Sequence, residues 1–395
     1  MNFEFQNPTR LIFGAGVLGR LGEVTRIHGK RALVVTGGGS VKRNGTFDRA
    51  QAALKAAGVN VVECAGVEPN PRISTVIRGS QIARGDGCDV IVALGGGSTM
   101  DAAKAMAAAF YYEGDPWDMI YHGQANWKLP TRALPIITVP TLAATGSEMN
   151  GGAVISNEKT TVKSFVIAPC LYPRVAVVDP ELTLSVPPDQ TAYGVCDLIT
   201  HVTESYFNGV DGTPLQDRFA EGTILSAMEW GPKAAADGKD LEARSQVQWA
   251  SVVALNGWVQ IGTLASFPVH TIEHVLSAHH DVAHGAGLAV VNPAWMRAAA
   301  KSRPARFVQF AQRIFGLAAK QPDDMDCALA GVNRFEEFLR SIGCPTRLSE
   351  MGIGDKLISR YARDAVSIVH DAESRLPGRP PMNEEEIADM LRSAL

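Results

Sequence analysis

The first half of this chain alternates between short β-branched runs and alanine-rich stretches with helical spacing, and this pattern limits the possible folds. The runs that predict strands are Arg31–Val35, Val59–Glu63, Asp89–Leu94, Ile136–Val139 and Val175–Val178. Helices are predicted between several of them, as at Phe47–Ala57 and Met100–Ala109. Strand–helix–strand alternation predicts a mostly parallel sheet with helices on both faces.

After Asp179-Pro180 the β-branched runs largely stop and long helical patterns follow. These patterns cover Gln190–Phe207, Leu215–Met228, Gln246–Gly257, Pro268–His279, Gly285–Ala300, Phe307–Phe315 and Arg334–Ile342. Asp371–Pro381 is rich in proline, arginine and acidic residues, which indicates a surface loop before a last helix. We therefore predict an α/β dinucleotide-binding domain over residues 1–183 and an all-α domain over residues 184–395, because 395 residues suit two domains.

Composition argues against several classes of protein. A net charge of -4 gives no reason to expect nucleic acid or an anionic membrane surface as a partner. The six cysteines form no CxxC pair, which argues against a thiolate zinc site and a disulfide framework. The N-terminal sequence lacks the pattern of a signal peptide, and no apolar run has the length of a membrane helix. We expect a soluble, cytoplasmic protein.

A glycine-rich loop lies between the strand Asp89–Leu94 and the helix that follows it, and it predicts a phosphate site. Glycines let the backbone approach a phosphate, and a helix N-terminus offers N–H groups and a partial positive charge. Asp101 suits the first helical turn electrostatically, but we also count it among the cofactor-binding candidates. The residues predicted to bind the pyrophosphate here are Gly96, Gly97 and Ser98.

A second glycine-rich loop, Gly37–Ser40, follows the strand Arg31–Val35 and bears on cofactor choice. A site for NAD usually has an acid near this point to hold the adenosine 2′-hydroxyl, whereas a site for the 2′-phosphate has a base. Here the loop is neutral and Lys42 and Arg43 are close. Gly37, Gly38 and Ser40 therefore favour NADP(H). The formal G-x-G-x-x-G at Gly14–Gly19 lacks the following acid, so we interpret it as a tight turn.

Small hydroxyl side chains cluster after the strand Ile136–Val139. They could hydrogen-bond a ribose, an amide or a phosphate, although serine and threonine are also common in loops. The candidates are Thr138, Thr141, Thr145 and Ser147.

The histidines predict a metal site, because five of nine fall between His270 and His284. Asp197 and His201 are four residues apart, which places a carboxylate and an imidazole on one helical face. Together with His270 and His284 they would form a set of three nitrogens and one oxygen, with a coordination position open for substrate. Imidazole suits Zn, Fe, Cu and Ni alike, and the carboxylate adds some hardness, so both Fe²⁺ and Zn²⁺ fit this set.

Other histidines do not fit this set. His279 and His280 read as surface residues at a helix end. We assign no role to His28, His122 and His370.

The ordered motifs resemble the group III, iron-dependent alcohol dehydrogenase family, whose fold is shared with dehydroquinate synthase and glycerol dehydrogenase. The resemblance runs nearly end to end, and it is strongest to the NADPH-dependent butanol dehydrogenase/aldehyde reductase branch. It rests on Asn7–Arg10 with Phe13-Gly14, Gly37–Ser40, Glu68–Pro71, Gly95–Asp101, Pro140–Glu148, Asp179-Pro180, Asp197–His201 and His270–His284.

The resemblance implies further roles. His274 matches a family histidine near the nicotinamide and substrate, and Lys163 resembles the lysine near the nicotinamide ribose. Asn70, within the Glu68–Pro71 motif, joins the cofactor-binding candidates. Relatives are commonly dimers, so a homodimer is expected.

The resulting hypothesis is hydride transfer between NADP(H) and an alcohol–aldehyde pair, with the metal polarising the carbonyl oxygen. A proton could pass through His274, and Trp258 and Phe267 suggest an unbranched or aromatic aldehyde. Two other classes remain open at this point. A dehydroquinate synthase-type lyase would need a strongly basic pocket, which the histidine region lacks in sequence, and a non-catalytic binding module would not need both a phosphate loop and a full ligand set.

Overall fold

The computed structural model describes residues 2–395, and the chain forms two compact units. The sheet unit comprises residues 6–187 and 237–252. The helical unit comprises residues 2–5, 188–236 and 253–395. Helix α8 (Leu241–Ala254) thus lies mostly in the sheet unit, although it follows two helices of the helical unit in sequence. The domain boundary at residues 183 and 184 stays a prediction.

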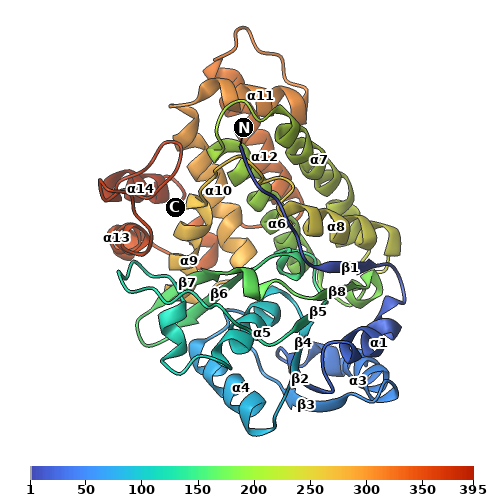
Figure 1. The fold of residues 1–395 in the computed structure, drawn as a ribbon. Helices are drawn as coiled ribbons and strands as arrows, with labels where there is room; N and C mark the ends of the chain where they lie inside the picture. The colour runs from blue at the N-terminus through green and yellow to red at the C-terminus, as the bar shows by residue number, and fades with distance from the viewer. Residues whose placement is uncertain (1) are drawn as a thin grey trace. The chain divides into compact units, whose positions relative to one another are not determined.

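The sheet unit is built on a six-stranded parallel sheet with the order β1-β8-β5-β4-β2-β3 (Figure 1). Its central strands are buried on both faces, which is why they read as unbroken apolar runs. The strands are β1 (Arg10–Phe13), β2 (Arg31–Thr36), β3 (Asn60–Cys64), β4 (Val90–Gly95), β5 (Ile136–Pro140) and β8 (Val175–Val178).

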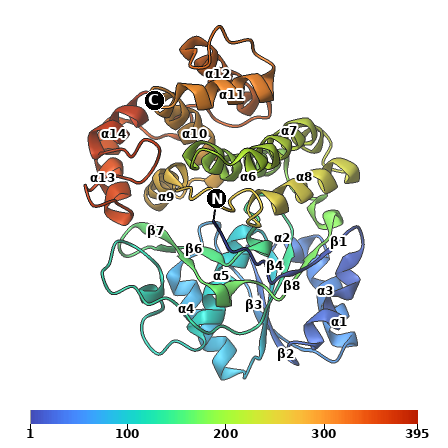
Figure 2. The ribbon, with the colours of Figure 1, turned by 45° about the horizontal axis from the view of Figure 1, so that its top comes forward.

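Helices cover both faces of this sheet. One layer packs α4 and α5 against alternate strand residues such as Ile91 and Ala93, and the other packs α1 and α3 against Val90 and Val92. Figure 2 shows α4 and α5 on one side of the strands and α1 and α3 on the other. The helices of this unit are α1 (Leu21–Arg26), α2 (Ser40–Arg43), α3 (Thr46–Ala56), α4 (Ile73–Gly85), α5 (Gly97–Ala109) and α8.

The strand order reverses between β2 and β4. From β2 the chain moves outward to β3, whereas from β4 it moves the other way to β5 and β8. In open parallel sheets ligands bind beyond the carboxyl ends of the strands at such a reversal. The loops Gly37–Gly39 and Gly96–Ser98 lie at this place.

A two-stranded hairpin, β6 (Gly152–Asn157) and β7 (Val162–Ile167), was not foreseen from the sequence. Its apolar alternation is interrupted by polar residues that are nonetheless buried, among them Lys163 and Ser164. A half-buried strand is recognised in a sequence by the alternation of apolar, buried residues with polar, exposed ones. Because these polar residues are buried, the alternation is disturbed and the strands were missed.

The described part of the helical unit contains helices joined by loops and holds no named strand. Helix α10 contacts α6, α9 and α12, so it forms the centre of the unit. The helices are α6 (Pro188–Asn208), α7 (Pro214–Ala236), α9 (Pro268–His280), α10 (His284–Ala300), α11 (Pro304–Phe315), α12 (Met325–Ser341), α13 (Ile358–Ile368) and α14 (Glu384–Arg392). Several begin with proline, whose fixed φ and missing N–H suit the first helical turn.

The predicted fold class, an α/β unit followed by a helical one, is confirmed. Among residues 2–395 there is no helix with the length and apolarity needed to cross a lipid bilayer.

Candidate active site

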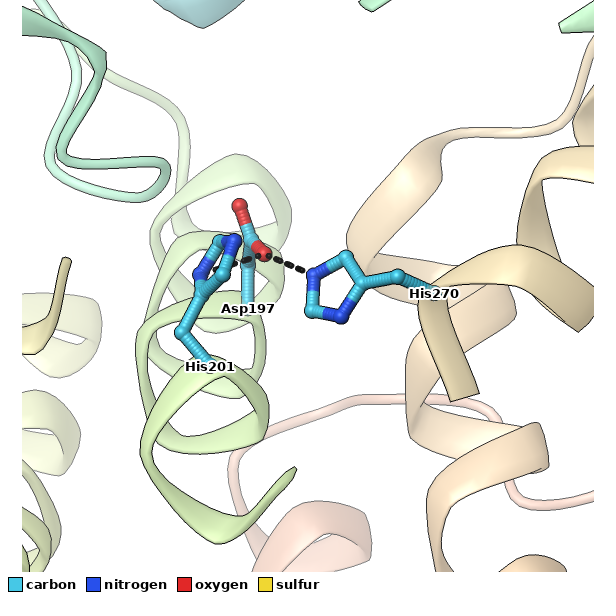
Figure 3. A group of neighbouring side chains, drawn as sticks. All are labelled: Asp197, His201 and His270. Carbon is cyan, nitrogen blue, oxygen red and sulfur yellow. Dashed lines mark ion pairs between the residues drawn. The ribbon is translucent and has the colours of Figure 1, made fainter. Parts of the chain in front are cut away.

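One face of helix α6 carries a carboxylate and an imidazole that both point toward helix α9. Asp197 and His201 are one helical turn apart, and both are buried. His270 lies in the first turn of α9, which begins at Pro268. Figure 3 shows His270 facing Asp197 and His201 from the opposite helix.

Three imidazole nitrogens approach the same oxygen, Asp197 Oδ1. His201 Nδ1 lies 3.3 Å away, His270 Nε2 3.5 Å and His284 Nε2 3.8 Å. The rings of His201 and His270 are tilted at a centroid separation of 4.3 Å. The structure therefore brings the four predicted metal ligands together around one point.

The atoms of this cluster fit a cation. Within residues 2–395, the buried atoms Asp197 Oδ1, His201 Nδ1 and His270 Nε2 have no hydrogen-bond partner. A buried polar atom left in this state costs about 1–3 kcal/mol, so such atoms call for an explanation. Histidine nitrogens and a carboxylate oxygen are the ligands that Zn²⁺ and Fe²⁺ accept, and a metal ion would satisfy all three atoms at once.

The electrostatics of the cluster also favour a positive charge. Burial raises the pKa of Asp197, but the imidazoles of His201, His270 and His284 outweigh burial and lower this pKa to about 2. Burial lowers the pKa of His201 to about 4. Burial also opposes a charge on His270, yet Glu204 and Asp197 raise its pKa to about 10. A carboxylate and a neutral imidazole are thus ready as ligands at neutral pH, whereas His270 has to release a proton before its Nε2 can bind a metal.

His284 reaches the cluster because the chain reverses sharply between α9 and α10. Asp281 ends α9 in the left-handed conformation, at φ 52°, and His284 is the first residue of α10. A side chain at Gly285 would collide with the backbone of Tyr193 on α6, so glycine permits this close helix approach.

His274, the predicted catalytic residue, lies one turn beyond His270 on α9 and is buried. Its ring is 6.2 Å from that of His270 and 5.5 Å from that of His284, centroid to centroid. Ligand atoms of Glu273, His274 and His284 also lie within 4.8 Å of one another, so they form a second potential ligand group beside the first.

Two glutamates that were not predicted from the sequence contact the rings of His270 and His284 on the side away from Asp197. Glu204 contacts His270 Nδ1, and Glu273 contacts His284 Nδ1. Both carboxylates are completely buried. A weak signal existed, because Glu204 continues the Asp197–His201 face of α6 three residues further on.

His279 and His280, at the end of α9, lie outside the cluster of proposed metal ligands. His279 Nε2 pairs with Asp364 Oδ2 at 2.8 Å, and His280 Nε2 lies 2.6 Å from the hydroxyl of Tyr361. Both partners belong to α13. These contacts explain the two histidines without a metal.

In the sheet unit, the loop after β2 carries a base at its surface. Arg43 Nη1 donates to Gly38 O at 3.4 Å, whereas Lys42 is paired with Glu63 on β3. Gly38 has open space where a side chain would be, and Gly39 has a φ of 99°. Arg43 is therefore better placed than Lys42 to meet a phosphate at this loop.

The loop after β4 leads into α5, whose first N–H groups have no partner within the helix. A side chain at Gly97 would overlap Thr145, so the hydroxyl-rich loop after β5 lies directly against this turn. Ser98 Oγ donates to Pro69 O, and Lys163 Nζ donates to Asn70 Oδ1 at 2.9 Å. Five predicted cofactor-binding residues thus lie at the turn between β4 and α5 or next to it: Asn70, Gly97, Ser98, Thr145 and Lys163.

The remaining hydroxyl candidates differ in their surroundings. Ser147 Oγ donates to Asp101 at 2.7 Å, and the other oxygen of Asp101 accepts from Val154 N at 2.9 Å. Thr141 N donates to Gly95 O at 3.0 Å. Thr138 is fully buried within β5, and its hydroxyl has no hydrogen-bond partner in the described part of the chain.

The turn at Gly14–Gly19 is held from within the protein. The N–H groups of Gly16 and Leu18 both donate to the Asp179 carboxylate at 3.1 Å. Asp179 therefore occupies the place of an anion, which agrees with a structural turn.

Two family models match this chain, one over most of the sheet unit and one over most of the helical unit. The family described as iron-containing alcohol dehydrogenase matches residues 8–180, and the C-terminal part of the Fe-containing alcohol dehydrogenase family matches residues 191–395. NADH-dependent butanol dehydrogenase A of Clostridium acetobutylicum is 38% identical over all of both chains. The NADPH-dependent aldehyde reductase of Escherichia coli is 38% identical over 89% of each chain.

A solved structure gives the same result. The NADH-dependent butanol dehydrogenase A of Thermotoga maritima superposes with a TM-score of 0.94 at 37% identity, over 100% of this chain and 98% of that one. Fold and sequence together define an oxidoreductase.

The chain belongs to the iron-containing alcohol dehydrogenase family, as the resemblance in its motifs implied. It is an alcohol dehydrogenase or aldehyde reductase, and the family implies a nicotinamide cofactor and a divalent metal. The lyase and the non-catalytic module are set aside.

Proposed function

We propose that this chain reduces aldehydes to alcohols with NADPH, reversibly, at a divalent metal held by Asp197, His201, His270 and His284. The observation that carries the proposal is the approach of three imidazole nitrogens to one buried carboxylate oxygen. A bound Fe²⁺ or Zn²⁺ would supply Lewis-acid polarisation of the substrate oxygen. The nicotinamide would supply the hydride.

The protein residues position and protect the reacting groups. His274 lies beside His270 and His284, within reach of a small molecule bound at the cluster, and we assign it the role of guiding a proton to the substrate oxygen. The ring of Phe267 stands edge-on to His270 at 5.9 Å and supplies an apolar wall. This wall favours the alkyl chain of an unbranched aldehyde such as butanal.

The preference for NADPH rests on the loop after β2. Gly37, Gly38 and Ser40 bring no acid to the place of the adenosine ribose, and Arg43 lies on the loop. The relatives do not agree on the cofactor. The butanol dehydrogenase of C. acetobutylicum is called NADH-dependent, and the E. coli aldehyde reductase is called NADPH-dependent. The choice of NADPH is therefore supported by the residues of this loop.

The remaining cofactor assignments keep the residues predicted from the sequence. Gly96, Gly97 and Ser98 would receive the pyrophosphate at the start of α5. Asn70 and Lys163, Asp101, and the hydroxyls of Thr138, Thr141, Thr145 and Ser147 would line the rest of the cofactor site. A homodimer in the cytoplasm is proposed from the family resemblance alone, and light scattering would test the dimer.

The direct test follows the oxidation of NADPH and of NADH, separately, with butanal and metal-loaded protein. Rapid oxidation of NADPH with slow oxidation of NADH supports the full proposal. Equal rates, or faster NADH oxidation, keep the dehydrogenase and overturn the cofactor choice. The His270→Ala variant should lose bound metal and most activity, and full activity without metal would overturn the ligand set.

A further inference from the structure

We propose that Glu204 and Glu273 are positioning residues that fix the ring orientation and tautomer of His270 and His284, so that each presents Nε2 to the metal. This inference rests on the proposed metal site. It concerns residues that hold the ligands and do not themselves contact the metal.

Glu204 fixes both the ring and the backbone of His270. It lies on α6, on the same face as Asp197 and His201. One carboxylate oxygen contacts His270 Nδ1, and the other accepts from the backbone N–H of Val269 at 2.5 Å and of His270 at 3.4 Å. With Nδ1 occupied, the ring turns Nε2 toward Asp197 Oδ1, 3.5 Å away.

Glu273, one turn beyond His270 on α9, contacts the ring of His284. Its carboxylate contacts His284 Nδ1 and also accepts from the hydroxyl of Ser277. His284 Nε2 then lies 3.8 Å from Asp197 Oδ1. A side chain at Gly287 would come within 2.8 Å of Glu273 Cγ and Oε1, so α10 leaves the space that Glu273 fills.

The chemistry explains why a carboxylate stands at each position. A neutral imidazole has one N–H donor and one acceptor nitrogen. When Nδ1–H donates to a carboxylate, Nε2 keeps its lone pair and becomes the ligand atom, and the negative charge increases its basicity. Two fully buried carboxylates are costly unless they are compensated. A divalent cation beyond the two imidazoles would compensate them.

This arrangement also separates two possible roles of Glu273. Glu273 could instead be a ligand, because its carboxylate, His274 and His284 also form a potential ligand group. Its contacts with Nδ1 of His284 and with Ser277 favour the positioning role. A positioning role predicts one metal ion per chain, whereas a second centre at Glu273 predicts two.

The chain offers a matched control on the same helix. His279, near the end of α9, pairs with the carboxylate of Asp364 at 2.8 Å, but neither residue belongs to the cluster. Asp364→Asn therefore removes a carboxylate from a histidine without touching the proposed metal ligands.

The experiment titrates Co²⁺ into the full-length apoprotein in competition with a chelator and records the visible Co²⁺ spectrum. Wild type should bind one Co²⁺ per chain. Glu204→Gln and Glu273→Gln should each weaken Co²⁺ binding by about 10–100-fold and shift the spectrum. Asp364→Asn should change neither readout, and thermal unfolding of each apoprotein checks that the variants are folded.

The outcomes are distinct. If wild type binds no Co²⁺, the proposed metal site fails, and the positioning proposal fails with it. If wild type binds Co²⁺ and both glutamine variants bind it as tightly as Asp364→Asn, the positioning proposal alone is overturned. Two Co²⁺ ions per wild-type chain would overturn it for Glu273. If Glu273→Gln does not fold, Ser277→Ala replaces it, because this variant removes the hydrogen bond that holds Glu273. Ser277→Ala should weaken Co²⁺ binding by about 2–10-fold. An unchanged Co²⁺ affinity would count against the proposal.

Discussion

The two units both bury carboxylates, but they compensate them differently. In the sheet unit, Asp101 and Glu148 share a fully buried neighbour, Lys104. In the helical unit, Asp197, Glu204 and Glu273 are surrounded by imidazoles. The first cluster contains its own cation, the Lys104 ammonium group, although Glu148 Oε1 has no hydrogen-bond partner among residues 2–395. In the second cluster, Asp197 Oδ1, His201 Nδ1 and His270 Nε2 have no hydrogen-bond partner among the described residues, so this cluster fits an additional cation.

The difference separates two ways of building a cofactor site. In the sheet unit the predicted pyrophosphate contacts come from backbone at the start of α5. In the helical unit the side chains themselves are the ligands. Substitutions should therefore act on stability or cofactor affinity in the first unit, and on the presence of the metal in the second.

The largest expected effect is that of Asp197→Asn. The amide is a poor substitute for the only carboxylate among the four proposed ligands, so we expect loss of bound metal and a decrease in kcat of about 1,000-fold or more. Metal analysis and NADPH oxidation would measure both. Asp101→Asn is the matched change in the sheet unit and should leave the metal content unaltered. A metal-free Asp101→Asn protein would contradict the contrast between the two clusters.

The next largest effect is expected at the resident cation of the sheet unit. Lys104 Nζ donates to Ser147 Oγ, Asn150 Oδ1 and Gly152 O at 2.7 to 3.1 Å. Lys104→Met leaves these acceptors and two buried carboxyl groups uncompensated, so we expect a loss of about 3–5 kcal/mol in the free energy of unfolding. Urea unfolding would measure it.

Metal binding provides the control for that prediction. If Lys104 is only the internal cation of its cluster, folded Lys104→Met protein still binds one metal ion per chain. Adding Glu148→Gln should restore part of the lost stability because one of the uncompensated carboxyl groups is then neutral. No restoration would indicate that the hydrogen bonds of Lys104 matter more than its charge.

The strands of the sheet unit were largely predictable, because parallel strands buried on both faces leave continuous β-branched runs. Val175–Val178 was predicted with the bounds of β8. The hairpin β6–β7 was missed because its buried polar residues, Lys163 and Ser164, disturb the alternation that marks a strand. Helices α4 and α13 were not predicted, and α12 was predicted only in its second half.

The metal candidates were predictable for a different reason. Histidine is rare, so five histidines between positions 270 and 284 stand out, and the spacing of Asp197 and His201 places both on one face. Glutamate is common on helices, so the position of Glu204 on the Asp197–His201 face is only a weak signal, and the sequence does not distinguish a buried Glu273 from a solvated one. Only tertiary packing, with each carboxylate against a histidine Nδ1, reveals them.

A smaller effect is expected at the loop after β2. Arg43→Ala should raise the KM for NADPH by about 10–100-fold, because one charge-assisted hydrogen bond to a phosphate contributes about 1.5–3 kcal/mol. The KM for NADH should stay unchanged, since NADH lacks that phosphate. Lys42→Ala is the matched control, because Lys42 is paired with Glu63 and should affect NADPH less. Equal increases for both cofactors would place Arg43 elsewhere in the cofactor site.

The smallest effect, and the finest test of the sheet-unit cluster, is the pH dependence of stability at Glu148. Burial raises the pKa of Glu148 from 4.5 to about 7, although Lys104 opposes the shift. The native state therefore binds the proton more tightly than the unfolded state. This stabilising contribution is fully present below pH 4.5 and is lost as the pH rises through about 7.

Lys104 does not obscure this window, because its pKa is lowered only to about 8 and it stays charged below that pH. Burial raises the pKa of Asp101 as well, so this carboxyl group also contributes in the native protein. Comparison of the wild type with Glu148→Gln isolates the contribution of Glu148 to the pH dependence of stability. Between pH 5 and pH 7 the wild type should lose at most about 2 kcal/mol relative to Glu148→Gln, measured by thermal unfolding at the two pH values. Parallel curves for the two proteins would mean that Lys104 already keeps Glu148 ionised in the native state, and Lys104 would then form a buried ion pair with Glu148.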